Sequence, residues 1–238
     1  MNIALIGYGK MGKTIETLAT AKGHRIVLKI ERSNAHELTT NALQNADVCI
    51  EFTGPDSAFK MVSACLNAGK PTVCGSTAWL DHLEEAQQLA LNNNTALLYA
   101  SNFSLGVNLF FKINRYASKL LGRYPQYDVS INETHHTQKK DAPSGTAVTL
   151  AEGILAEHPT KNTWVKEIAQ QPHELPIHSE RIDPAPGTHL IRWASAIDTI
   201  ELCHTAHSRE GFAAGALLAA EFLANKKGIF TMEDVLID

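Results

Sequence analysis

Two histidines and two lysines lie within six residues in the stretch ETHHTQKKDAPSGTA, residues 133–147. Histidine readily gives up a proton near neutral pH, and lysine can stabilise negative charge that develops during a reaction. Pro143 suits the first turn of a helix and Ser144 suits its cap, so the backbone N–H groups of Gly145 and Thr146 are expected to be free. The stretch therefore predicts a compact site for a small polyanion beside a proton donor.

Two other interpretations of this stretch follow from the charges alone. One is a solvated loop in which the histidines and lysines are incidental. The other is a zinc site, which is the poorer alternative because neighbouring histidines point in different directions and no third ligand stands at a useful spacing. We therefore expect no metal.

A second motif, GYGKMG at Gly7–Gly12, matches GxGxxG directly after an expected strand and at the start of an expected helix. Its glycines provide a tight turn, a close approach to a pyrophosphate and close packing of the helix on the strand. Glu31, 19 residues after Gly12, lies where a carboxylate binds the adenosine ribose. Arg32 could pair with a 2′-phosphate, so the motif predicts a site for NADH, NADPH or both. The alternative is that Glu31 and Arg32 merely end a strand in water.

The elements that position these motifs fall into two halves. The first hundred residues alternate apolar runs with helical periodicity, which is typical of a doubly wound parallel sheet of the Rossmann type. The loops FTGP at Phe52–Pro55 and CGSTA at Cys74–Ala78 follow its third and fourth strands and are expected at the cofactor edge. The expected strands are 3–6, 25–30, 48–52, 72–74 and 96–99, and the expected helices are 11–21, 57–68 and 80–91.

The second half indicates an α+β domain with an open mixed sheet. The polar stretch 158–171 holds few apolar residues and is expected to be a loop, whereas the strands 189–194 and 198–206 flank a short turn and predict a hairpin. The other expected strands are 127–131 and 177–182, and the expected helices are 106–121, 145–155 and 211–223.

Composition excludes several classes of protein. The 238 residues carry a net charge of −4, so no global positive field favours nucleic acid or an anionic membrane. The first residues have no signal-peptide pattern, and no apolar run is long enough to span a membrane. The four cysteines form no CxxC pair and are expected to be reduced, buried thiols of a cytoplasmic protein: Cys49, Cys65, Cys74 and Cys203.

The sequence resembles the dihydrodipicolinate reductase family, also called 4-hydroxy-tetrahydrodipicolinate reductase. The resemblance rests on GYGKMG, Glu31-Arg32, FTGP, GSTA, SNFSLGVN, HHTQKKDAPSGTA and HSREGFAAGA, which span nearly the whole chain. It implies reduction of 4-hydroxy-tetrahydrodipicolinate to tetrahydrodipicolinate in lysine and diaminopimelate biosynthesis, with hydride passing from NADH or NADPH to ring C4. It also implies a homotetramer, with residues 1–104 and 209–238 as the dinucleotide-binding domain and 105–208 as the domain for the dicarboxylate substrate and for oligomerisation.

The resemblance assigns roles to individual residues. His135 resembles the family's proton donor and Lys139 its catalytic companion. The substrate ligands would be His136, Gly145 and Thr146. The cofactor ligands would be Gly7, Tyr8, Gly9, Lys10, Met11, Gly12, Glu31, Arg32, Gly75, Ser76, Thr77, Ala100, Ser101, Asn102 and Phe103.

Some segments depart from the family pattern. The glycine-rich turn is one residue shorter than in many members, GSTA replaces a more usual GTTG, and RIDPAPGTH at 181–189 carries two prolines. Two rival functions remain: a different dehydrogenase, which should lack HHxxKxDAPSGTA, and a non-catalytic NAD(P)-responsive regulator, which would have no need of His135 and Lys139.

Overall fold

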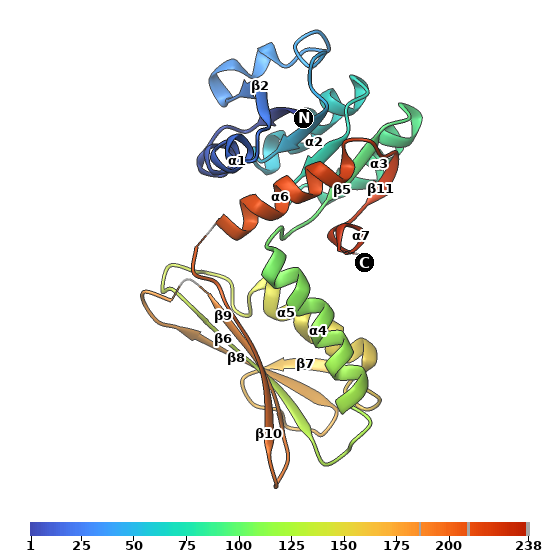
Figure 1. Ribbon diagram of the computed structural model, residues 1–238. Helices are drawn as coiled ribbons and strands as arrows, with labels where there is room; N and C mark the ends of the chain where they lie inside the picture. Colours follow the sequence, from blue (N-terminus) through green and yellow to red (C-terminus); the bar gives the residue numbers. More distant parts are fainter. Residues whose placement is uncertain (186, 209, 237–238) are drawn as a thin grey trace. The chain divides into compact units, whose positions relative to one another are not determined.

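The computed structural model describes residues 1–185, 187–208 and 210–236 (Figure 1). The chain forms two compact units. The first unit contains Met1–Leu105 together with the segment from Glu210 onward, and the second unit begins at Gly106. The chain thus leaves the first unit, builds the second and returns.

The first unit is built on a six-stranded parallel sheet. Its order is β11-β5-β4-β3-β1-β2, with β1 in the interior. Successive strands are added on one side of β1 and then on the other, as in doubly wound sheets. The strands are β1 (Asn2–Ile6), β2 (Arg25–Ile30), β3 (Val48–Glu51), β4 (Thr72–Cys74), β5 (Ala96–Tyr99) and β11 (Gly228–Phe230). The expected Rossmann-type fold is confirmed.

Helices cover both faces of this sheet (Figure 1). Ile3 and Leu5 of β1 pack in the cluster that contains α1 and α6, while Ala4 and Ile6 pack in a cluster with α2. This alternation follows from the two-residue period of a strand. The helices are α1 (Lys10–Ala21), α2 (Pro55–Asn67), α3 (Leu83–Asn92), α6 (Glu210–Leu223) and the short η1 (Arg32–Glu37), η2 (Leu80–His82) and α7 (Met232–Val235).

The second unit is a mixed five-stranded sheet in the order β10-β9-β6-β8-β7. The helices α4 (Leu105–Leu121) and α5 (Gly145–Glu157) both contribute to the core cluster on one face, which contains Val129, Ile131 and Trp193. The strands are β6 (Asp128–His135), β7 (Thr163–Lys166), β8 (Glu174–Arg181), β9 (Thr188–Ala194) and β10 (Thr199–Thr205). The predicted hairpin is present as the antiparallel pair β9–β10.

The structure corrects four expectations. β6 does not end at Ile131 but continues through His135, and the alternating buried positions continue with it. The stretch 158–171, expected as a loop, contains the edge strand β7, in which only Trp164 and Val165 are apolar and partly buried, so the surrounding polar residues hid the strand. β11 was not expected, because its three residues are only partly buried or exposed, whereas the equally short β4 is fully buried and apolar enough to be recognised. Cys203 is exposed on the edge strand β10, whereas the other three cysteines are buried as expected.

No helix among the described residues is both long and apolar enough to cross a membrane.

Candidate active site

The three glycines of the Gly7–Gly12 turn are present for different structural reasons. Gly7 has φ +101°, and a Cβ there would lie 2.2 Å from the carbonyl oxygen of Phe52. A Cβ on Gly12 would lie 2.4 Å from the carbonyl oxygen of Gly7. A Cβ on Gly9, the residue that precedes α1, would meet nothing within 4 Å. Gly7 and Gly12 are therefore required by the protein's own packing, while Gly9 leaves open space at a helix N-terminus.

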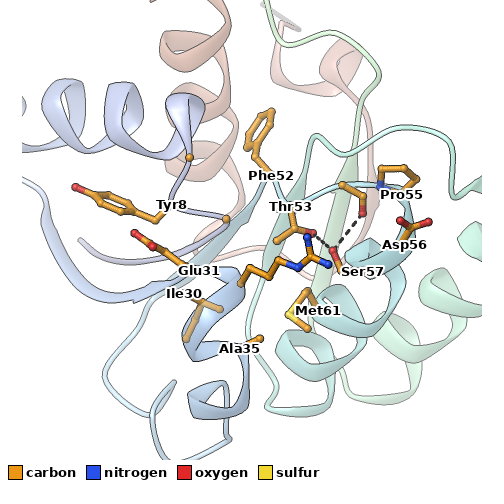
Figure 2. A pocket seen from close by; sticks show the side chains of 14 residues that line it. Tyr8, Ile30, Glu31, Ala35, Phe52, Thr53, Pro55, Asp56, Ser57 and Met61 are labelled. Atoms are coloured by element: carbon orange, nitrogen blue, oxygen red, sulfur yellow. Dashed lines mark hydrogen bonds between the residues drawn. The ribbon is translucent and has the colours of Figure 1, made fainter.

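A cavity of about 540 Å³ opens beside this turn (Figure 2). Figure 2 shows Tyr8 and Glu31 on one side of it and Asp56 on the other. Its walls come from the turn, the end of β2 and the loop that leads from β3 into α2. The lining residues are Gly7, Tyr8, Gly9, Ile30, Glu31, Arg32, Ala35, Phe52, Thr53, Gly54, Pro55, Asp56, Ser57 and Met61. The cavity thus lies at the carboxyl ends of β1, β2 and β3, the edge at which doubly wound sheets bind nucleotides.

Five of the expected cofactor residues line this cavity: Gly7, Tyr8, Gly9, Glu31 and Arg32. The other expected cofactor residues lie outside its lining, namely Lys10, Met11, Gly12, Gly75, Ser76, Thr77, Ala100, Ser101, Asn102 and Phe103. Several of these serve the core of the unit: Met11 and Ala100 pack against the main cluster, and Phe103 is a buried member of it.

Tyr8 is held in place by its own contacts. Its hydroxyl donates a hydrogen bond to Glu16, and the Lys29 ammonium lies 4.7 Å from the centre of its ring. Lys29 also forms an ion pair with Glu16 at 2.7 Å, and hydrogen bonds from Lys29 and Tyr8 lower the pKa of the Glu16 carboxyl. These contacts fix one wall of the cavity.

Glu51 is a site-organising residue that the sequence reading missed. It ends β3 and is fully buried. Its carboxylate accepts hydrogen bonds from the backbone N–H of Thr53 at 2.6 Å, the hydroxyl of Ser76 at 2.8 Å and the thiol of Cys74 at 2.9 Å. Glu51 therefore ties together the loops after β3 and β4. The available signal was an acid at the end of the apolar run Val48–Glu51.

In the second unit, strand pairing brings three titratable groups together. Glu133 on the central strand β6 lies opposite His189 on β9 and Ser179 on β8. The Glu133 Oε2 atom is 3.5 Å from His135 Nε2 and 3.6 Å from His189 Nε2, and the two imidazole nitrogens are 3.3 Å apart. All three residues are buried. Glu133 and His189 are functional candidates that the sequence reading did not single out.

The Glu133 carboxylate has further donors around it. It accepts hydrogen bonds from the backbone N–H of Ser144 at 3.0 Å, the hydroxyl of Ser179 at 2.9 Å and the guanidinium of Arg181 at 3.1 Å. Burial raises the pKa of Glu133, but the hydrogen bonds from the two histidines, Ser144 and Ser179 together outweigh it and hold the pKa far below the usual range. Glu133 is therefore an ionised, buried acceptor. Burial also lowers the pKa of His189 and favours its neutral form.

The helix α5 begins beside this cluster. Ser144 caps it, with its Oγ atom accepting a hydrogen bond from the backbone N–H of Ala147 at 3.2 Å. Gly145, the first residue of the helix, is exposed, and a Cβ there would meet nothing within 4 Å. Thr146 follows it and is half-buried. The helix N-terminus is thus open to a ligand while its cap is bound to Glu133.

The remaining expected residues lie in the loop between β6 and α5. The Lys139 ammonium forms an ion pair with Asp141 at 2.9 Å, and His136 is half-buried. Arg181 donates to the backbone carbonyl oxygens of Lys139 and Asp141 as well as to Glu133, so one guanidinium ties this loop to the buried carboxylate.

The structure overturns one premise of the metal argument. A third group of metal-binding type does lie near, because strand pairing places the Glu133 carboxylate and the imidazoles of His135 and His189 within 4.8 Å of one another. These groups also have other neighbours: the carboxylate accepts from Ser144, Ser179 and Arg181, and the His189 imidazole contacts the Ser144 hydroxyl. That a metal is not used remains a prediction.

A doubly wound sheet with a nucleotide-type glycine turn, joined to a mixed-sheet unit that holds buried histidines, is the arrangement expected of a nicotinamide-dependent oxidoreductase. Comparison with known sequences gives the family. Residues 1–103 match the family described as dihydrodipicolinate reductase, N-terminus, and residues 106–236 match dihydrodipicolinate reductase, C-terminus. The chain belongs to the dihydrodipicolinate reductase family and is an NAD(P)H-dependent oxidoreductase.

Individual relatives agree with this. The 4-hydroxy-tetrahydrodipicolinate reductase of Christiangramia forsetii is 46% identical over 239 residues, which cover 100% of this chain and 98% of the relative. The enzyme of the same name from Thermosipho africanus is 33% identical and covers 99% of this chain and 98% of its own. The solved structure of dipicolinate-bound dihydrodipicolinate reductase from Paenisporosarcina sp. TG-14 has a TM-score of 0.81 at 24% identity, covering 100% and 99% of the two chains, which shows a shared fold.

Proposed function

We propose that the protein reduces 4-hydroxy-tetrahydrodipicolinate to tetrahydrodipicolinate in lysine and diaminopimelate biosynthesis. NADH or NADPH delivers a hydride to ring C4, the hydroxyl group leaves as water, and one proton is taken up, so that the cofactor ends oxidised and the ring reduced. The observation that carries this proposal is the 46% identity to a named reductase across the whole chain.

His135 is proposed as the proton donor, with Lys139 as its catalytic companion. Support comes from the position of His135 at the end of β6, two residues after an ionised carboxylate that can stabilise an imidazolium. Lys139 is paired with Asp141, and this ion pair would have to open for its ammonium to reach a substrate.

The substrate carboxylates are proposed to bind at the start of α5, through Gly145 and Thr146 with help from His136. Glycine weakens a helix, and neither a positive φ nor a close neighbour explains Gly145 from within the protein. Room for an anion at a helix N-terminus does explain it.

The cofactor is proposed to bind in the cavity beside Gly9, whose volume is typical of ligand pockets. Glu31 would hold the ribose hydroxyls of NADH, and Arg32 the 2′-phosphate of NADPH. The remaining cofactor residues named from the resemblance stay proposals, as do the domain roles of 1–104 with 209–238 and of 105–208, the cytoplasmic location and the homotetramer.

The test is the loss of absorbance at 340 nm with NADH and with NADPH, using freshly generated product of the preceding synthase step. Substrate-dependent oxidation is expected. His135→Ala should lower kcat by about 10²-fold or more, whereas His173→Ala, which changes an exposed histidine of the same unit, should not. Wild-type turnover by folded His135→Ala would refute the role of His135, and no oxidation with either cofactor would refute the function.

A further inference from the structure

The hydrogen bonds around His135 determine which of its two nitrogens can deliver a proton. The Nε2 atom faces inward, 3.5 Å from the Glu133 carboxylate and 3.3 Å from Nε2 of His189. A carboxylate that is ionised can only accept hydrogen bonds. The His135 Nε2 atom must therefore carry a hydrogen, since a lone pair there would face a negative charge.

The cap of α5 determines the state of His189. The Ser144 hydroxyl has one hydrogen and lies 3.1 Å from His189 Nε2, while its oxygen already accepts from the backbone N–H of Ala147. The other polar neighbour of this hydroxyl is the Glu133 carboxylate, which already accepts from the Ser144 N–H, Ser179 and Arg181. We assign the hydroxyl hydrogen to the 3.1 Å contact with His189, whose Nε2 atom is then an acceptor and can also face the Nε2–H of His135.

These assignments leave no two hydrogens pointing at each other. A hydrogen on His189 Nε2 would instead compete with the Nε2–H of His135 for the same Glu133 oxygen, at 3.6 Å and 3.5 Å. The neutral form of His189 also agrees with its burial.

We propose that Glu133, His189 and Ser144 are positioning residues that fix the tautomer of His135, so that the proton it transfers sits on Nδ1. This inference rests on the proposed role of His135 as proton donor. The Nε2–H of His135 stays hydrogen-bonded to Glu133 during proton transfer, and Nδ1 is the atom that the substrate approaches. A carboxylate that holds one imidazole nitrogen while the other reacts is a recurrent catalytic arrangement.

A glycine lies against the Nδ1 edge of the ring. Gly187 has φ +148°, and a Cβ there would lie 3.2 Å from Nδ1 and 3.0 Å from Cε1 of His135. A side chain at position 187 would therefore crowd the edge at which the proposal places the substrate. This observation is independent of the hydrogen bonds on the Nε2 side.

The first test reads the tautomer without activity. In the wild-type protein labelled with ¹⁵N-histidine, two-bond couplings distinguish protonated from bare ring nitrogens, and the His135 signals are assigned by their loss in His135→Ala. At a pH where the ring is neutral, a proton on Nε2 and a bare Nδ1 are expected for His135. A proton on Nδ1 with Nε2 bare would overturn the inference, whatever the turnover of the variants.

The second test changes the acceptor. Glu133→Gln places an amide where the carboxylate stood, so an N–H group can face His135 and favour the opposite tautomer. We expect kcat to fall by about 10²-fold or more while KM changes little, because substrate binding is proposed to rest on α5. A folded Glu133→Gln protein with unchanged kcat and an unchanged His135 tautomer would contradict the positioning role.

The third test changes the hydroxyl. Ser144→Ala removes both the hydrogen given to His189 and the cap of α5; loss of the hydrogen should lower kcat, whereas loss of the cap at the proposed substrate site should raise KM. Ser144→Thr keeps a hydroxyl that can serve both and should regain part of kcat. Equal losses of kcat in both variants would count against the relay through His189. Turnover that is abolished by chelation and restored by added Zn²⁺ would also overturn the inference, because the three groups would then face a cation instead of sharing hydrogens. Wild-type turnover by His135→Ala with the expected tautomer in the wild type would refute the proposed role of His135 as proton donor and leave the tautomer assignment standing.

Discussion

Two glycines of the Gly7–Gly12 turn should respond in opposite ways to the same added methyl group. In Gly12→Ala, the new Cβ would start 2.4 Å from the carbonyl oxygen of Gly7, whereas folded proteins essentially never show such a contact below 3.0 Å. The backbone must therefore separate by about 0.6 Å at the junction of β1 and α1. In Gly9→Ala, the new Cβ meets nothing.

The energies follow from these contacts. Overpacking costs about 1–3 kcal/mol, and the upper part of that range, about 2–3 kcal/mol, applies because the 2.4 Å contact is with backbone. Alanine regains about 1 kcal/mol in a helix, so Gly12→Ala should lose about 1–2 kcal/mol of unfolding free energy. For a chain of this size that is a fall in Tm of roughly 2–8 °C. For Gly9→Ala, a weaker helix cap and a less flexible unfolded chain nearly cancel, so stability should stay within about 1 kcal/mol of wild type.

The affinity for the cofactor should be affected more in Gly9→Ala than in Gly12→Ala, the reverse of the effect on stability. The methyl group of Gly9→Ala would occupy the open space proposed for the pyrophosphate, so the Kd for NADH should rise by about tenfold or more, equivalent to about 1.4 kcal/mol. Thermal unfolding measures the loss of stability in Gly12→Ala, and the change of NADH fluorescence on titration measures the Kd of Gly9→Ala. If Gly9→Ala binds NADH like wild type, Gly9 does not leave space for the cofactor. If Gly12→Ala has an unchanged Tm, Gly12 is not required by packing.

Three further predictions concern buried groups and the start of α5. The pKa values of Glu133 and His189 are lower in the folded protein, so the unfolded chain binds more protons than the folded one. The urea midpoint of unfolding should therefore fall as the pH drops through about 6.5, where an unfolded histidine is protonated, and again below about 4.3, where an unfolded glutamate is protonated. A midpoint that stays constant from pH 8 to pH 4 would contradict this. Glu51→Ala leaves buried donors such as the Ser76 hydroxyl unsatisfied and should cost about 2–4 kcal/mol by urea unfolding, with Glu51→Gln costing less. An equal cost would mean that only side-chain volume matters. Gly145→Val should raise KM for the substrate by about tenfold or more, with stability changed by under about 1 kcal/mol, and an unchanged KM would remove Gly145 from the substrate site.

The first unit could be predicted well because its central strands are buried on both faces and its helices have one apolar face. Periodicity then reports structure directly, and the turn at Gly7 follows a strand as the nucleotide motif requires. β11 could not be predicted in this way, because its position at the edge of the sheet depends on pairing with β5.

The second unit shows why part of the site could not be predicted. In β6, the buried positions after Val129 and Ile131 are taken by Glu133 and His135. These polar residues interrupt the alternating apolar pattern that would identify the strand, in the part of the strand that carries the proposed site. His189 lies 54 residues after His135, and only the register of β6 on β9 brings the two together. Single-sequence patterns carry no register between distant strands. The positions of His135 and Gly145 were available from their motif, whereas the partners of His135 were not.

The return of the chain to its first unit has a consequence for synthesis on the ribosome. α6 supplies Ala213, Ala216, Ala220 and Leu223 to the main core cluster, and β11 adds the sixth strand. While residues 106–208 emerge, the nascent first unit exposes the apolar face that α6 will cover. The inserted unit, by contrast, has its whole sheet within one continuous segment. We expect it to mature first, although its codons come later, and we expect nascent chains stalled before residue 210 to engage chaperones through the uncovered face.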